Sequence, residues 1–127
     1  MRIFKNTWFT RFCRKENIPD EALQDAVWRA NHGQIDADLG GGIIKQRIAR
    51  AGRGKSKGYR TILLFRKDEK AFFVFGFGKG EQANISKDEE AHFKLMAKEI
   101  FGLSDKQLEL LTERKHFEEL TSHDQEI

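Results

Sequence analysis

Positively charged side chains gather in the middle of this sequence. Eleven Lys and Arg residues lie between Ile43 and Lys79, where only Asp68 and Glu69 oppose them, so the segment carries a net charge of +9. Residues 1–42 hold six basic and six acidic residues, and residues 80–127 hold six basic and twelve acidic residues. The formal net charge of +3 therefore hides a strongly basic segment beside an acidic tail. Such a segment attracts polyanions, and nucleic acid is the partner it favours.

Three apolar runs carry these cations. Residues 43–48, 59–65 and 71–77 are rich in Ile, Val, Phe or Tyr, and turn-forming residues separate them, which is typical of β-strands. Strand side chains alternate between two faces, so Lys45 and Arg47 lie opposite the apolar face of the first run. Asp68 and Glu69 predict a tight turn between the second and third runs. The segment therefore predicts a three-stranded antiparallel meander, with its third strand covered on both faces.

A glycine-spaced loop, residues 51–57, joins the first two predicted strands. Its cations are Arg53, Lys55 and Lys57. Glycines let the backbone approach a phosphodiester, and the cations neutralise it; an ordinary solvated loop is the alternative. The cations of the neighbouring strands, with Arg60 at the start of the second, favour a nucleic-acid surface. The Gly-Lys-Ser sequence at 54–56 is not a Walker A loop, because position 49 is Ala and the segment leads into a strand.

Two further residues stand at the ends of the predicted strands. Tyr59, the only tyrosine, adjoins Arg60 and can stack on an unpaired base, or it can pack across the strands. Lys79 sits among three glycines in GFGKGE, which indicates either a cation held at the sheet rim or a snorkelling edge lysine.

Predicted helices flank the meander. Residues 1–5 suit a short opening strand, and Asn6 or Thr7 can cap a helix that runs through Glu16. After Pro19, Asp20 can cap a second helix over about 21–32, and Gly33 can end it. The two helices form a hairpin that can lie on the sheet.

Capping signals also mark the C-terminal half. Ser86 and Glu89 form a capping box before a helix over about 87–101, and Ser104 can begin a fourth helix that reaches about residue 120. The predicted fold class is α+β: an N-terminal helical hairpin packed on a twisted antiparallel sheet, with one or two C-terminal helices.

Other chemistry finds little support in the sequence. The histidines lie on predicted helices or in the tail, so none is assigned as a base; they are His32, His92, His116 and His123. Cys13, the single cysteine, excludes an internal disulfide and a Cys-based zinc site, and we expect no metal or cofactor. No run approaches the roughly 18 apolar residues of a membrane span, and the start lacks the apolar core of a signal peptide. We expect a single cytoplasmic domain with no membrane partner.

The order GGIIKQRIA, RGKSKGYR, TILLF and FFVFGFGKGE resembles the RelE/ParE-type toxins of bacterial toxin–antitoxin modules, and most closely their HigB-like branch. The resemblance covers roughly residues 1–101, a RelE-like toxin domain, and leaves 102–127 as a helical extension with a frayed tail. It implies an antiparallel sheet flanked by helices, and a ribosome-dependent mRNA endoribonuclease that blocks translation. It also implies a cognate antitoxin, which we expect to be a helix-turn-helix protein, with the ribosome and mRNA as further partners.

The resemblance also suggests roles for single residues. By position, Arg60, Lys55 and Lys79 match the cations expected to be catalytic. The expected RNA-binding residues are Lys45, Arg47, Arg53, Lys57 and Tyr59. Many relatives have a histidine or tyrosine near the end of the last strand, where this sequence has Phe75 and Phe77. Two alternatives stay open: a ParE-like toxin that inhibits gyrase, and a non-catalytic RNA-binding module of the same fold.

Overall fold

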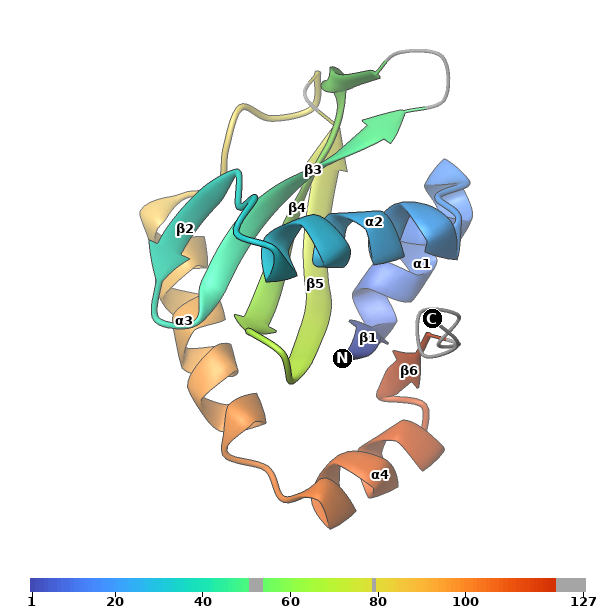
Figure 1. Cartoon of the computed structure of the whole chain (residues 1–127), viewed down its shortest axis with the longest axis vertical. Helices are drawn as coiled ribbons and strands as arrows, with labels where there is room; N and C mark the ends of the chain where they lie inside the picture. Colours follow the sequence, from blue (N-terminus) through green and yellow to red (C-terminus); the bar gives the residue numbers. More distant parts are fainter. Residues whose placement is uncertain (51–53, 79, 121–127) are drawn as a thin grey trace.

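The computed structural model describes residues 1–50, 54–78 and 80–120, with the backbone alone at 54–57. The chain begins with strand β1 (Arg2–Asn6) and helices α1 (Thr7–Glu16) and α2 (Asp20–Asn31). Strands β2 (Ala37–Gly40), β3 (Ile43–Arg50), β4 (Gly54–Arg66) and β5 (Lys70–Gly78) follow. Helices α3 (Lys87–Phe101) and α4 (Asp105–Glu113) and strand β6 (Phe117–Glu119) complete the described part (Figure 1).

Within the described residues the strands form one six-stranded sheet, in the order β2-β3-β4-β5-β1-β6. The predicted meander is confirmed, because β3 pairs antiparallel with β4, and β4 with β5. The predicted turn is confirmed too, since Asp68 takes a left-handed conformation with φ of 62° between β4 and β5. β1 pairs parallel with β5, so the sheet is mixed rather than antiparallel.

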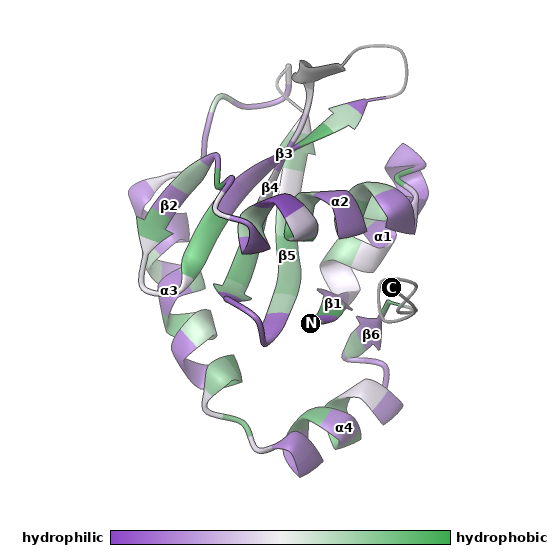
Figure 2. Ribbon diagram, viewed as in Figure 1, coloured by the Kyte–Doolittle hydropathy of each residue, from purple (hydrophilic) through white to green (hydrophobic). Residues whose placement is uncertain are grey.

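Each face of the sheet has its own core. On one face, α1 and α2 bury residues such as Phe9, Leu23 and Phe73. On the other, α3 and α4 help to bury residues such as Phe4 and Phe72. Figure 2 shows hydrophobic residues following the central strands, while hydrophobic and hydrophilic residues alternate along the helices. The helices are thus amphipathic covers of a two-sided sheet.

Local signals account for most of the helix ends. The Asn6 side chain accepts a 2.8 Å hydrogen bond from the Phe9 amide at the start of α1. The Ser86–Glu89 capping box is formed, and α3 spans the predicted residues. Ser104 caps α4 as predicted. Gly33, with φ of +83°, follows the last residues of α2 in the left-handed region that glycine favours.

Four predictions about the N-terminal and central part need correction. The predicted opening strand is confirmed as β1, so the helical hairpin that the predicted fold class set at the N-terminus is not the first element. Pro19 rather than Asp20 is the N-cap of α2, because its fixed φ suits the extended cap position. The sequence pattern missed β2. β4 already begins at Gly54, so part of the predicted loop is strand and the rest, residues 51–53, lies outside the described residues.

The C-terminal helix also ends earlier than predicted. α4 stops at Glu113, and Lys115, with φ of 67°, lets the chain reverse into β6. β6 pairs antiparallel with β1, and the Leu120 amide donates a 2.8 Å hydrogen bond to the Ile3 carbonyl. Phe117 packs on Phe72 with ring centroids 5.3 Å apart. Burial of this side chain draws the segment onto the sheet, and residues 102–120 thereby join the fold of the preceding residues.

Candidate nucleic-acid interface

The register between β3 and β4 brings two arginines side by side. Arg47 is the direct partner of Arg60, and Lys45 pairs with Ile62 two residues along. Opposed residues of an antiparallel pair share a face and have Cβ atoms about 4.5–5.5 Å apart. The predicted alternation is confirmed, because Ile44, Gln46 and Ile48 are buried on the face opposite these cations. Like charges in opposed positions repel, and an anionic ligand bound beside both guanidinium groups would offset that repulsion.

The structure supplies limited counter-charge for Arg47. The Arg47 amide donates a 2.6 Å hydrogen bond to the Asp36 carboxylate, and the guanidinium Nε lies 3.8 Å from the other oxygen. Asp36 also lies 3.7 Å from Nη1 of Arg29, so one carboxylate serves two cations. The Arg47 side chain remains 46% exposed. It is oriented by Asp36 and still open to a phosphate.

Buried Gln46 explains why Asp36 stands there. The Gln46 side chain is fully buried, and its oxygen accepts a 2.7 Å hydrogen bond from the Asp36 amide. Its nitrogen donates to the carbonyls of Ala26 and Gln34. A polar residue buried in the core thus ties the segment before β2 to β3 and α2. Sequence reasoning missed Asp36, and no local signal reveals it, because the contact joins separate segments.

The other sequence-predicted cations are placed less completely. Lys45 donates a 3.1 Å hydrogen bond from its Nζ to the Asn84 side chain, and Arg60 is half-buried. Lys55 and Lys57 belong to β4, where the structure describes their backbone only. Arg53 and Lys79 lie outside the described residues. The structure therefore brings together Lys45, Arg47 and Arg60, and the loop residues stay predictions.

Tyr59 does not belong to this face. Its side chain is 3% exposed, and its hydroxyl donates a 2.9 Å hydrogen bond to Glu16. The Arg50 guanidinium lies 4.9 Å from the centre of its ring, and Phe12 packs edge-on against it. Burial, together with the Glu16 carboxylate, raises the pKa of the hydroxyl. Stacking of Tyr59 on a base is therefore wrong for this conformation, and the packing alternative holds.

Strand β5 offers aromatic rings next to the arginines. Phe77 is the direct partner of Arg60, and Phe75 is the partner of Ile62. Phe77 is 2% exposed, whereas Phe75 is half-buried between Phe93 and Trp8, at centroid distances of 5.7 and 4.7 Å. Neither ring can transfer a proton. The face thus places Lys45, Arg47 and Arg60 beside aromatic side chains.

The remaining candidates for chemistry lie elsewhere. Cys13 is buried, and burial raises the pKa of its thiol to about 11, so the thiol is unsuited to nucleophilic attack. In the part of the chain that the structure describes, no three His, Cys, Asp or Glu side chains cluster as metal ligands. None of the described helices is long and apolar enough to cross a membrane.

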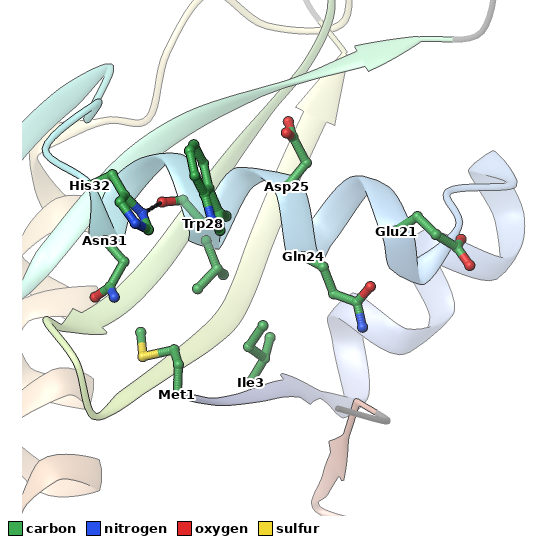
Figure 3. A pocket seen from close by; sticks show the side chains of 9 residues that line it. Met1, Ile3, Glu21, Gln24, Asp25, Trp28, Asn31 and His32 are labelled. Atoms are coloured by element: carbon green, nitrogen blue, oxygen red, sulfur yellow. Dashed lines mark hydrogen bonds between the residues drawn. The ribbon is translucent and has the colours of Figure 1, made fainter. Parts of the chain in front are cut away.

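A cavity of about 320 Å³ lies along α2 and the start of the chain, and its lining includes the carboxylates of Glu21 and Asp25. Figure 3 shows Trp28 and His32 side by side at the end of α2, with Asp25 and Glu21 farther back along the helix. The Trp28 and His32 rings stack with their centroids 4.0 Å apart. Asp25 is already paired with Arg29 at 3.0 Å, so Glu21 carries the open carboxylate charge that disfavours a phosphate in this cavity.

The fold and the grouped arginines define a small α+β protein with a cationic face on its β3-β4-β5 meander. The family model described as the RelE toxin of the RelE/RelB toxin–antitoxin system matches residues 1–120. The chain belongs to this family and is a toxin of a toxin–antitoxin system, in which toxin and antitoxin pair. No curated protein matches the chain.

Proposed function

We propose that this toxin is a ribosome-dependent mRNA endoribonuclease of the HigB-like branch, acting in the cytoplasm and blocking translation. One observation supports this most: the β3–β4 register that sets Arg47 beside Arg60 on one face. A paired guanidinium site suits a phosphodiester, because each planar fork can donate two hydrogen bonds to phosphate oxygens. We propose further that a helix-turn-helix antitoxin holds the toxin inactive.

The chemistry uses the nucleophile that RNA itself carries. The 2′-hydroxyl attacks the adjacent phosphate, the bond to the 5′-oxygen of the next nucleotide breaks, and a 2′,3′-cyclic phosphate and a 5′-hydroxyl result. Arg60 stabilises the negative charge that develops on the phosphorane, and preorganised charge of this kind is often the largest catalytic contribution. Arg47, Lys45, Arg53 and Lys57 hold the flanking phosphates.

Proton transfer falls to Lys55 or Lys79 in this proposal. A lysine crowded by other cations has a lowered pKa and can exchange a proton near neutral pH. One observation favours the non-catalytic RNA-binding alternative: Phe75 and Phe77 occupy the end of β5, next to Arg60. These rings supply no base. Whether Lys55 or Lys79 transfers a proton therefore decides between the endoribonuclease and the non-catalytic RNA-binding module.

Induced expression followed by mapping of mRNA 5′ ends tests the proposal. Wild-type protein should arrest growth, stop protein synthesis and create new mRNA ends within translated regions. Arg60→Ala should remove the new ends while the protein stays folded by circular dichroism. Arg66→Ala is the matched control, since Arg66 ends the same strand and stacks on Phe101 at 4.5 Å, away from Arg47.

Three outcomes count against the proposal. Normal growth at confirmed high expression contradicts the toxic activity. Arrest with unchanged mRNA ends, but with loss of DNA supercoiling by gyrase in a purified assay, supports the ParE-like alternative. RNA binding by purified protein without any new ends, on ribosomes or in cells, supports the non-catalytic module.

A further inference from the structure

The sequence contains two tryptophans, and both are unusually open to solvent. Trp8 on α1 is 43% exposed and Trp28 on α2 is 55% exposed. Each lines a cavity, but the surroundings differ in charge. Glu21 and Asp25 line the Trp28 cavity, whose described lining has no Lys or Arg. Arg11 and Lys15 line the Trp8 cavity, together with Glu16 and Glu81. An exposed aromatic ring beside cations is the combination that binds single-stranded nucleic acid.

The Trp8 cavity exists because β1 is shorter than β5. The pairing of β1 with β5 ends at Lys5 and Phe73, and the chain then turns into α1. α1 therefore runs beside the rest of β5, which continues to Gly78. A cavity of about 380 Å³ lies between the helix and this end of the strand.

Packing holds the Trp8 ring in place. The ring stacks on Phe12 at a centroid distance of 5.3 Å and an interplanar angle of 17°. It also contacts Phe75 at 4.7 Å, on the strand across the cavity. A ring supported in this way loses little conformational freedom when a base stacks on it. It is therefore a preorganised platform, of which a base can reach the part that Phe12 and Phe75 leave exposed.

An aromatic path connects this platform with the arginine pair. Phe75 contacts Trp8 on one side and Phe77 on the other, with the two phenylalanine centroids 6.0 Å apart. Phe77 is in turn the direct strand partner of Arg60. Strand β5 thus lies between the Trp8 cavity and Arg60, the cation that the proposed function assigns to the phosphate. An RNA strand held at Arg60 can place a neighbouring nucleotide in the cavity.

The charge around Trp8 also suits RNA. Arg11 and Lys15 are exposed on α1 and line the cavity. Two carboxylates line it as well, those of Glu16 and Glu81. Glu16 is already engaged by Arg50 at 3.3 Å and by the Tyr59 hydroxyl. The described lining therefore keeps two open cations against one open carboxylate.

We propose that Trp8, Arg11 and Lys15 form a subsite for one unpaired nucleotide of the RNA, with the base stacked on Trp8 and its phosphate near the two cations. The identity of the ligand rests on the proposed function, whereas the site rests on the geometry of the cavity. The subsite is tolerant of sequence, because every base presents a π-face to a ring.

Single-tryptophan proteins test the stacking directly. Trp28→Phe leaves Trp8 as the only indole, and Trp8→Phe leaves Trp28. Each is titrated with a short 2′-O-methyl oligoribonucleotide, which lacks the attacking hydroxyl and cannot be cleaved. The oligonucleotide should quench the fluorescence of Trp8 and leave that of Trp28 unchanged. Quenching confined to Trp28, or absent from both, overturns the proposal.

Affinity measurements separate stacking from charge. Trp8→Ala should weaken binding of the oligonucleotide by roughly 5- to 150-fold, the range that loss of one stacked base produces. The loss should disappear with an oligonucleotide whose bases are removed, while Trp8→Phe should keep most of the affinity. Arg11→Ala and Lys15→Ala should each lower the log–log salt slope by about 0.7, as expected for a phosphate contact to a single strand. Trp28→Ala is the matched control and should change neither quantity.

The outcomes of this test and of the mRNA cleavage test are independent. If mRNA is cleaved and Trp8→Ala binds the oligonucleotide as wild type does, the subsite is refuted and the endoribonuclease stands. If Trp8 is quenched and no mRNA is cleaved, the subsite stands and the endoribonuclease fails. Quenching of Trp8 by the antitoxin alone, with no response to the oligonucleotide, makes the cavity a protein interface and overturns the RNA subsite.

Discussion

Replacement of Gly76 by alanine should destabilise the protein through a single added methyl group. Gly76 lies on β5 where α1 crosses it, and a Cβ atom there would stand 2.8 Å from Cε2 of Phe12 and 3.2 Å from Cε1 of Phe9. Real Cβ contacts are essentially never closer than 3.0 Å. Either the Phe12 ring or the helix must therefore move.

The Phe12 ring has little room to yield. It is 9% exposed, and it packs on Trp8, Phe9 and Tyr59 at centroid distances of 5.3, 5.6 and 5.6 Å. Overpacking of a core typically costs about 1–3 kcal/mol. Alanine also lowers the conformational entropy of the unfolded chain, which stabilises the folded state by about 0.4–1 kcal/mol and offsets part of this cost. We expect a net loss of about 1–2 kcal/mol in the free energy of unfolding.

Urea and thermal unfolding measure this loss. With a denaturant slope near 2 kcal/mol per molar, the urea midpoint should fall by about 0.5–1 M. The melting temperature should fall by about 4–8 °C. Gly80→Ala is the matched control, because a Cβ at that exposed position meets nothing within 4 Å. It should change stability by less than about 0.5 kcal/mol.

A second substitution sharpens the test. Phe12→Leu shortens the side chain that the new methyl group meets, so Gly76→Ala should cost less in that background, and the two substitutions should couple favourably in a double-mutant cycle. If Gly76→Ala unfolds at the same urea concentration as Gly80→Ala, the close packing of α1 on β5 is refuted. The Trp8 cavity, which depends on the same packing, would then lose its rigid floor.

Three further predictions concern titration, charge and the C-terminus. Burial raises the pKa of Cys13 above that of the unfolded thiol, so stability should fall as the pH rises from about 9 to about 11. Cys13→Ala should reduce that loss in urea unfolding, while Tyr59, whose pKa is also raised, keeps part of it; an unchanged pH profile would count against the prediction. Asp36→Asn should free the Arg47 guanidinium, because the asparagine side chain keeps an oxygen for the backbone N–H of Arg47 but carries no charge. The log–log salt slope of RNA binding should then steepen by up to about 0.7. An unchanged slope would show that Arg47 makes no phosphate contact. Truncation after Leu103 should lower the melting temperature, because it removes Phe117 from the core, and it should leave the salt slope of RNA binding unchanged. A stable protein that binds RNA more tightly would instead show that the acidic segment masks the cationic face.

Local sequence signals determined the parts of the fold that depend on neighbours in the chain. Helix α3 occupies the residues that its capping box and apolar spacing predict, because the side chain of Ser86 and the backbone it caps are three residues apart. The β4–β5 hairpin follows for the same reason, since a short turn at Asp68 joins its two strands. Such contacts join residues that are close in the sequence, so they do not depend on where the segment lies in the tertiary structure.

Pairings between distant segments depended on the tertiary structure. A five-residue strand such as β1 contains nothing that specifies a partner or a direction, and its parallel pairing with β5 leaves the end of β5 open for the Trp8 cavity. β6 is only three residues long, and it forms a strand because Phe117 finds a place in a core completed by distant segments. Propensity over three to five residues is too weak to predict either pairing.

The candidate site shows the same division. The sequence by itself determined that Lys45 and Arg47 share a face, because strand side chains alternate. The same alternation places Tyr59 and Arg60 on opposite faces, which the RNA-binding assignment of Tyr59 overlooked. It could not determine that Arg47 meets Arg60, since one residue of slip in the register would place them on opposite faces. Nor could it determine which face the helices α1 and α2 cover, and that choice buries Tyr59 and leaves Arg47 open. Alternation is a property of the backbone, whereas register and coverage follow from the packing of the whole core.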